Sequence, residues 1–185
     1  MTHRGQISFV GPFGVGKTTA VRAVSDADVV ETEARSTAAV LKTGKHTKPS
    51  STVGLEYGEW KSPSGVRLAV VGTPGQARFD EVRRSVMPRS TAVVLWLFGH
   101  HAEAVLDAEL WTQFILEEGV PARKLAVAVT RLEPGASLEP FEAAVRTYGG
   151  DKVPVLAADP RVRADVEAVL IASTRGGRSI PVTAS

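Results

Sequence analysis

The 185-residue sequence predicts an α/β protein built on a doubly wound, mostly parallel six-stranded sheet with one antiparallel edge strand. Three observations lead to this fold class. Short runs of β-branched and apolar residues, typical of buried strands, recur along the chain. Longer segments with apolar residues at helical spacing lie between these runs. One stretch instead alternates apolar and polar residues and leads through a turn into the next strand, as in a β-hairpin.

The predicted elements can be placed in chain order. Buried strands are expected over residues 6–10, 68–71, 92–97, 125–129 and 153–156. Crossover helices are expected over 17–25, 103–118, 139–148 and 161–173, and glycines stand where three of them should end, at Gly119, Gly149 and Gly176. The alternating stretch 53–60 is joined to the strand at 68 by a turn and supplies the antiparallel edge. Residues 1–174 therefore form one predicted domain, and residues 175–185 lack periodicity and are expected to be a flexible tail.

The composition excludes several classes of function. Hydrophobic residues make up 43% of the chain and charged residues 23%, as in an ordinary folded globular domain. The 22 Lys and Arg residues are scattered and nearly balanced by 20 Asp and Glu residues, which argues against a nucleic-acid-binding surface. The absence of cysteine excludes disulfides, thiolate metal sites and thiol nucleophiles, and is compatible with a reducing cytoplasm.

No segment is expected to anchor the chain directly in a membrane. The longest apolar run, 92–98, is far shorter than the roughly 20 residues that span a bilayer, and no charged-then-apolar secretory signal begins the chain. Thr2 stands where myristoylation needs glycine, and no cysteine is present for prenylation. We therefore expect a cytoplasmic protein whose recruitment to a membrane would need a partner.

The first motif lies between the strand at 6–10 and the helix that begins at Lys17. It matches G-x-x-x-x-G-K-[ST], the phosphate-binding P-loop, in the strand–loop–helix context that this motif needs. Glycines let backbone N–H groups turn toward phosphates, and the helix N-terminus adds its positive end. Lys17 is expected to reach the β- and γ-phosphates, and the Thr18 hydroxyl to bind Mg²⁺. The predicted nucleotide contacts in this motif are Gly11, Phe13, Gly14, Val15, Gly16, Lys17, Thr18 and Thr19.

A second segment begins at Thr52 and reads Thr-Val-Gly-Leu-Glu-Tyr-Gly. It is similar to the T-I-G-x-[DE]-[FY] segment of Rab-type GTPases, in which the threonine closes on Mg²⁺ and the γ-phosphate when GTP is bound. This resemblance gives Thr52 a catalytic and metal-binding role. Threonine is also favoured at the start of an edge strand, so both interpretations stay open.

A third segment, Gly-Thr-Pro-Gly-Gln-Ala-Arg-Phe over residues 72–79, follows the strand at 68–71. It resembles the switch II segment D-[TA]-[AP]-G-Q-x-R-F of Ras-like GTPases. By that resemblance Gly75 offers its backbone N–H to the γ-phosphate and Gln76 orients the attacking water. Both residues would promote the reaction by positioning the reacting groups. The alternative for Gln76 is an exposed loop glutamine, and the P-loop upstream favours the catalytic role.

Together these segments resemble the small Ras-like GTPases of actinobacterial conservons (the CvnD type), relatives of the MglA polarity GTPases, whose phosphate loop typically reads G-G-F-G-V-G-K-T-T. The likeness continues to residues 163–171 in the last predicted helix and covers nearly the whole chain. It implies a Ras-like G domain of the P-loop NTPase class and a GTP/GDP cycle with Mg²⁺. It also implies protein effectors or regulators, among them a roadblock-type protein. The implied function is a slow GTPase that acts as a molecular switch in bacterial signalling.

The sequence departs from the general Ras-like pattern beside the phosphates. Gly72 stands where most of these proteins have an aspartate that holds a Mg²⁺-bound water, so weaker metal binding is expected. Phe13 stands where many have glycine, and its ring could block an arginine finger from a partner. Arg78 could supply an internal arginine instead, or could simply lie exposed to solvent.

The segment expected to select the base also departs from the pattern. Ras-like proteins have N-K-x-D after the strand at 125–129, and this chain has Thr130, Arg131, Leu132 and Glu133. Glu133 could accept hydrogen bonds from guanine and Arg131 could lie along the base, but Thr130 cannot reproduce the donor and acceptor of asparagine. A backbone N–H near Ala158 or Asp159 is expected to meet the base. The predicted base contacts are Thr130, Arg131, Glu133 and Ala158.

These departures leave two alternative functions open. A poor fit to guanine would relax base specificity and allow the protein to use ATP. The changes at Gly72 and Thr130 also suggest a nucleotide-binding scaffold that has lost hydrolysis. Of the remaining candidate residues, His100 and His101 are interpreted as loop residues, and Trp60, Trp96 and Trp111 are expected to pack in interfaces.

Overall fold

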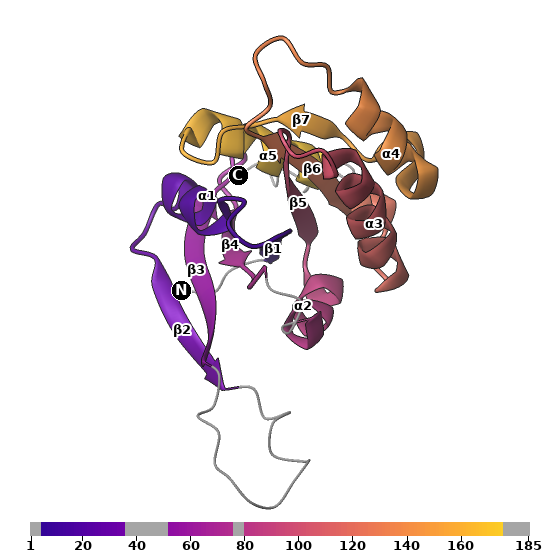
Figure 1. Ribbon diagram of the computed structural model, residues 1–185. Helices are drawn as coiled ribbons and strands as arrows, with labels where there is room; N and C mark the ends of the chain where they lie inside the picture. Colours follow the sequence, from indigo (N-terminus) through magenta and orange to yellow (C-terminus); the bar gives the residue numbers. More distant parts are fainter. Residues whose placement is uncertain (1–4, 36–51, 76–79, 176–185) are drawn as a thin grey trace, which may run out of the picture.

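The computed structural model of the protein describes residues 5–35, 52–75 and 80–175. Its centre is one sheet of seven strands in the order β2-β3-β4-β1-β5-β6-β7 (Figure 1). Strand β1 pairs in parallel with β4 and β5, and the parallel ladder continues through β6 to β7. The strands are β1 (Gln6–Val10), β2 (Val30–Arg35), β3 (Thr52–Lys61), β4 (Arg67–Gly72), β5 (Ala92–Phe98), β6 (Leu125–Thr130) and β7 (Val155–Ala157).

The mostly parallel α/β class is confirmed, but the prediction of six strands is wrong. A seventh strand, β2, pairs antiparallel with β3, and β3 pairs antiparallel with β4. Strand β3 is thus the antiparallel strand, but it lies one position in from the edge, which β2 occupies. The sequence of β2, VETEAR, has three charged residues and an exposed Val30, so it carries none of the apolar pattern of a buried strand.

Helices cover both faces of this sheet (Figure 1). One face packs against α1 (Lys17–Val24) and α5 (Arg163–Arg175), and the other against α3 (Ala104–Glu117) and α4 (Glu139–Gly149). The short helix α2 (Asp80–Val86), which was not predicted from the sequence, leads into a 3-10 turn at Met87–Arg89. Further 3-10 turns lie at Ala122–Lys124 and Gly150–Lys152.

Strand β5 shows why the sheet has a core on both faces. Val94 and Trp96 are buried in the cluster beneath α1 and α5, whereas Leu95 and Leu97 are buried in the cluster beneath α3 and α4. Successive side chains of a strand point to opposite faces, so a continuous apolar run serves both clusters. This explains why β1, β5 and β6 could be predicted from apolar runs. Trp60 and Trp96 are buried as expected.

The strand directions decide where the loops meet. Because β1, β4, β5, β6 and β7 run parallel, the loops that follow them lie at one edge of the sheet. Strand β3 runs the other way, so its first half, including Glu56 opposite Gly72, lies at that same edge. Within the described ranges no helix is long and apolar enough to cross a membrane. Arg175, the first residue of the predicted tail, is the last residue of α5, and residues 176–185 lie outside the described residues.

Candidate functional site

The loop between β1 and α1 has the backbone that only glycine adopts easily. Gly11 and Gly16 have φ values of 133° and 110°. A Cβ atom at Gly11 would lie 2.1 Å from the Trp96 carbonyl oxygen, and one at Gly16 would lie 2.7 Å from a ring carbon of Pro160. Both glycines of the predicted motif are therefore required by conformation and by space. The loop packs directly on β5 and on the loop that follows β7.

Lys17 closes over this loop. Its Nζ atom donates to the carbonyl oxygens of Gly11, at 2.9 Å, and Pro12, at 2.7 Å. Burial and the positive charge of Arg83 lower the pKa of Lys17 to about 8, although Glu56 partly counteracts them. An ammonium group held by carbonyl oxygens at a helix N-terminus has a position from which it can turn to phosphate oxygens.

A cavity of about 360 Å³ adjoins the loop and Lys17. Loop residues Phe13, Gly14, Gly16, Lys17, Thr18 and Thr19 line one side of it. Residues 54, 56 and 73–75 line the other side, so β3 and the segment after β4 both reach it. The structure therefore brings Gly75, a predicted phosphate contact, to the P-loop, where a Cβ atom at residue 75 would lie 2.4 Å from the Phe13 nitrogen. The Phe13 side chain is 70% exposed.

Thr18, the predicted metal-binding residue of the loop, has a charged partner. Its hydroxyl donates to a carboxylate oxygen of Glu56 on β3. Glu56 stands directly opposite Gly72 in the β3–β4 ladder, and both Thr18 and Glu56 line the 360 Å³ cavity. No local pattern in the sequence singles out Glu56, because its contact with the loop depends on the direction in which β3 runs.

A second predicted catalytic residue, Thr52, lies on β3. The Thr52 backbone is paired with Arg35 at the far end of the β2–β3 ladder. At a rise of about 3.3 Å per residue it lies about 13 Å along β3 from Glu56. A metal-binding role for Thr52 would thus require this end of the hairpin to rearrange. Gln76 and Arg78 lie outside the described residues.

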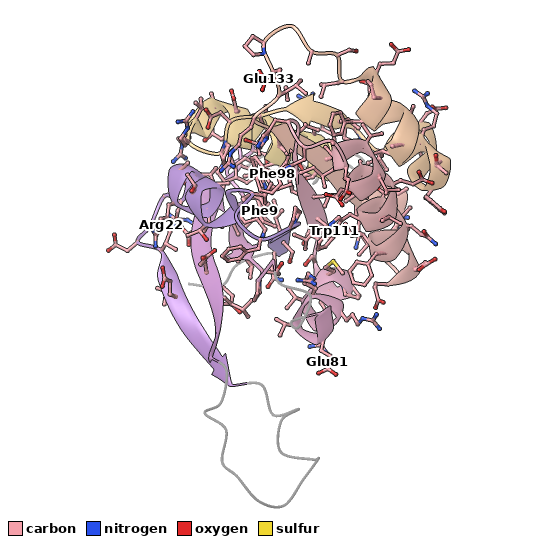
Figure 2. All side chains as sticks on the ribbon, viewed as in Figure 1. Phe9, Arg22, Glu81, Phe98, Trp111 and Glu133 are labelled. Atoms are coloured by element: carbon pink, nitrogen blue, oxygen red, sulfur yellow. The ribbon has the colours of Figure 1, made fainter. Side chains whose placement is uncertain are left out.

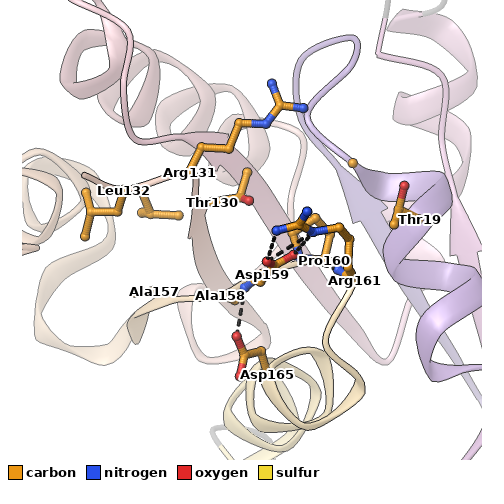
Figure 3. A pocket seen from close by; sticks show the side chains of 12 residues that line it. Thr19, Thr130, Arg131, Leu132, Ala157, Ala158, Asp159, Pro160, Arg161 and Asp165 are labelled. Carbon is orange, nitrogen blue, oxygen red and sulfur yellow. Dashed lines mark hydrogen bonds and ion pairs between the residues drawn. The ribbon is translucent and has the colours of Figure 1, made fainter. Parts of the chain in front are cut away.

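A second cavity, of about 640 Å³, lies on the other side of the loop (Figure 3). It shares Gly16 and Thr19 with the first cavity, so the two cavities adjoin at the start of α1, and together they are called the groove. Residues 129–132 after β6 and 157–161 after β7 line the rest of it, together with Asp165 of α5. The segments predicted to hold a base, including Thr130, Arg131 and Ala158, therefore meet at this cavity.

Arg131 forms one wall of the larger cavity. It is the one residue other than glycine with a positive φ, 55°, in the described part of the chain. Its guanidinium carbon lies 5.1 Å from the centre of the Phe98 ring, and its Nη2 atom lies 3.4 Å from the Gly14 carbonyl oxygen. The planar group thus bridges the P-loop and the end of β5, and a strained backbone holds it there.

Glu133 is not brought to this cavity. The residue is exposed and is absent from the cavity lining, and Figure 2 shows it on the outer loop that follows β6. In this structure Glu133 is thus not among the residues that line the cavity predicted to hold a base.

The backbone donors expected near Ala158 and Asp159 are already occupied. Ala158 N–H donates to the Val129 carbonyl oxygen at 3.0 Å, and Asp159 N–H donates to the Asp165 carboxylate at 2.9 Å. The next residue, Pro160, has no N–H. Ala158 thus lines the cavity, but its N–H, which was expected to meet the base, faces β6.

An ion pair at the rim of the larger cavity was not predicted. Asp159 accepts hydrogen bonds from the backbone and guanidinium of Arg161, the shortest at 2.6 Å. These bonds, first of all those of the side chain, lower the pKa of Asp159 to about 2. The signal was present in the sequence, because an Asp two residues before an Arg can accept from its backbone in an Asx turn. The cavity rim therefore carries a fixed carboxylate and a fixed guanidinium group (Figure 3).

Arg83 of α2 connects the smaller cavity to the helix layer. The residue is 2% exposed, its Nη1 atom donates to the Pro74 carbonyl oxygen at 2.5 Å, and its guanidinium carbon lies 5.2 Å from the centre of a Trp111 ring. Burial lowers the pKa of Arg83, but an arginine stays charged at neutral pH. The segment that carries Gly75 is thus fastened to α2 and α3. Trp111 packs partly buried in this interface, as predicted.

His100 and His101 lie in the loop after β5, as predicted. Their ring centres are 4.3 Å apart, and both rings pack edge-on against Phe98. They pack together because they lie beyond the end of the strand, so the alternation of a strand does not separate them. Within the described ranges, no group of three or more His, Cys, Asp or Glu residues could hold a metal ion. We assign the pair no metal role.

Comparison of the chain with protein-family models and with curated proteins gives no match. The fold itself is α/β, with a mostly parallel seven-stranded sheet and an antiparallel pair of strands at one edge. It is compatible with the fold of P-loop proteins. Assignment of a function therefore depends on the geometry of the groove.

Proposed function

We propose that this protein is a small P-loop GTPase with a Ras-like G domain, which binds GTP and GDP with Mg²⁺ and hydrolyses GTP slowly as a molecular switch. One observation carries the proposal. The glycine loop separates a small cavity, lined by Lys17 and Thr18, from a larger one of about 640 Å³, and both open onto the start of α1. This arrangement suits a ligand with phosphates at one end and a flat ring system at the other.

In the proposed reaction, water attacks the γ-phosphorus, the bond between that phosphorus and the β–γ bridging oxygen breaks, and GDP and inorganic phosphate leave. Lys17 and the loop N–H groups neutralise charge on the phosphates. Gly75 is assigned a backbone hydrogen bond to the γ-phosphate and Gln76 the orientation of the water. Thr18 and Thr52 are assigned to Mg²⁺, which would stabilise the charge that develops on the phosphate oxygens.

The first experiment measures the affinities of the purified protein for GDP, GTP and ATP, with Mg²⁺ and with EDTA, and identifies any nucleotide that copurifies. The proposal expects guanine nucleotides to bind more tightly, and more tightly still with Mg²⁺. ATP binding equal to or tighter than GTP binding would overturn the GTPase assignment. Hydrolysis unchanged by Gln76→Leu would remove Gln76 from the mechanism, and hydrolysis absent from the wild type would favour the scaffold alternative.

A second candidate function is nucleotide binding with relaxed base specificity, including use of ATP. The state of the larger cavity favours it, because guanine presents an acceptor at O6 and donors at N1 and N2. Here the N–H groups of Ala158 and Asp159 are occupied, Pro160 has none, and Glu133 lies on the outer loop. A site that lacks matched polar partners discriminates poorly between bases. Comparing GDP, IDP and ADP separates the two functions, since a guanine-specific site prefers GDP over ADP by at least about 100-fold.

The partners and the location belong to the same proposal. By family resemblance, a roadblock-type protein is a candidate regulator, and other effectors would read the difference between the GTP and GDP states. We propose a cytoplasmic protein that reaches a membrane only through such a partner. The test is the affinity for a roadblock-type protein with GDP, with a non-hydrolysable GTP analogue and without nucleotide. The same affinity in all three conditions would argue against a switch.

A further inference from the structure

We infer that Glu56, on β3, supplies the carboxylate that holds Mg²⁺, or a water bound to it, in place of a side chain at residue 72 on β4. The inference rests on the proposed function, since it assumes that a magnesium–nucleotide complex binds at the loop. It goes further by naming a metal-binding residue that neither motif nor family resemblance assigned. It also changes the expectation that Gly72 leaves the site without a carboxylate.

The Glu56 side chain and residue 72 compete for the same space. Glu56 and Gly72 are direct partners in the antiparallel β3–β4 ladder. A Cβ atom at residue 72 would lie 2.5 Å from the Oε2 atom of Glu56 and 3.4 Å from a methyl carbon of Val21. The Glu56 carboxylate therefore occupies the space into which a side chain at residue 72 would begin to extend. The position of the Glu56 side chain therefore depends on the absence of a side chain at residue 72.

Glu56 and Thr18 together offer oxygen ligands that suit Mg²⁺. The Glu56 carboxylate accepts a hydrogen bond from the Thr18 hydroxyl, and both groups line the cavity that also contains Lys17. Magnesium prefers hard oxygen ligands and is typically held in nucleotide sites by one or two carboxylates or hydroxyls together with phosphate oxygens and water. A carboxylate and a hydroxyl in contact at the phosphate end of the groove are that kind of donor set. The residues present thus fit the cation that the fold implies.

A purely structural role makes a different prediction. If Glu56 only fixed Thr18 and β3 by its hydrogen bond, its removal would loosen the loop and weaken nucleotide binding with and without Mg²⁺. If Glu56 binds the cation, its removal has opposite effects in the two conditions. Without Mg²⁺ the carboxylate repels the phosphates, so its loss leaves affinity unchanged or improves it, whereas with Mg²⁺ its loss weakens binding.

The test measures the GDP dissociation constant in EDTA and in saturating Mg²⁺, and the ratio of the two is the magnesium coupling. Glu56→Gln is expected to lower this coupling by about 10- to 100-fold, without weaker binding in EDTA. Glu59→Gln is the matched control. Glu59 lies on the same strand three residues further on, so it projects from the opposite face of the sheet, where it pairs with Arg67. It should leave the coupling unchanged.

A second variant moves the carboxylate back to β4. Glu56→Ala combined with Gly72→Asp removes the side chain that occupies the space and should restore most of the coupling that Glu56→Ala alone loses. A folded double variant that restores nothing would overturn the inference, as would normal coupling in Glu56→Gln. If the double variant does not fold, Glu56→Gln alone decides. Wild-type protein that binds GDP equally with and without Mg²⁺ would instead refute the magnesium dependence of the proposed function.

Discussion

Lys17 is the charged residue in the groove whose ionisation is most altered by its surroundings. Its pKa of about 8 means that the free protein loses the ammonium charge as the pH rises through 8. Bound phosphates favour the charged form, so the pKa in the complex is higher. The affinity for GDP should therefore be constant below about pH 8 and fall by up to about tenfold per pH unit above it.

The measurement is a titration of GDP affinity between pH 7.5 and 9.5, a range in which the nucleotide phosphates are fully ionised. Lys17→Met should bind weakly at every pH, with no such decline. A wild-type profile that stays flat to pH 9.5 would show that the phosphates do not depend on the charge of Lys17.

Arg131 gives a prediction for the other end of the groove. Its guanidinium group lies over Phe98 and beside the Gly14 carbonyl oxygen, and it forms a wall of the larger cavity. Arg131→Ala should weaken GDP binding about tenfold, because it removes the proposed contact between the guanidinium group and the guanine ring. Contact of a planar cation with an aromatic ring contributes about 1 to 2 kcal/mol. Isothermal titration measures this, and Arg146→Ala, on the exposed surface of α4, is the control. Inorganic pyrophosphate, which has no base, should bind both variants equally.

At the scale of elements, the loop that begins α1 depends on its contact with the loop after β7. Gly16→Ala would place a Cβ atom 2.7 Å from Pro160 in a backbone with φ of 110°, so it should destabilise the protein by about 1 to 3 kcal/mol and weaken nucleotide binding. Gly135→Ala is a matched control, because Gly135 also has a positive φ, 82°, but has no atom within 4 Å of the added Cβ. Urea unfolding gives the loss in free energy of unfolding for each variant. The difference between the two losses is the part caused by the contact with Pro160, since both variants share the backbone strain. Equal losses would mean that the Pro160 contact contributes nothing.

The elements and site residues that could be predicted from the sequence are those that leave a local pattern in it. Strands β1, β5 and β6 are buried on both faces, so their apolar runs predicted them closely, whereas β2 is a charged edge strand defined only by its pairing with β3. The glycine loop between β1 and α1 is local in sequence, so its backbone conformation could be predicted from the motif. Glu56 and Asp165 reach the groove because of the direction of β3 and the packing of α5, and no local pattern records such long-range geometry.

At the scale of the whole molecule, ligand binding should be visible as increased thermal stability. A ligand at 100 times its dissociation constant stabilises the folded state by about 2.7 kcal/mol, which raises Tm by about 5 to 10 °C for a chain of this size. GDP with Mg²⁺ should give this shift in a thermal denaturation experiment, and Lys17→Met should reduce it. No shift with any nucleoside diphosphate or triphosphate at millimolar concentration would contradict nucleotide binding altogether.

The buried amine of Lys17 also has a consequence for chemical reactivity. A lysine with a pKa of about 8 is about 10% unprotonated at pH 7, several hundred times more than a lysine with the usual pKa of 10.5. It is therefore a nucleophile at neutral pH, held where a phosphate end would dock. An uncharged acylating reagent should therefore acylate Lys17 of the nucleotide-free protein ahead of the chain's other lysines, whereas bound GDP should protect it. Mass spectrometry of the modified peptide, with and without competing GDP, would then map the groove in the native protein.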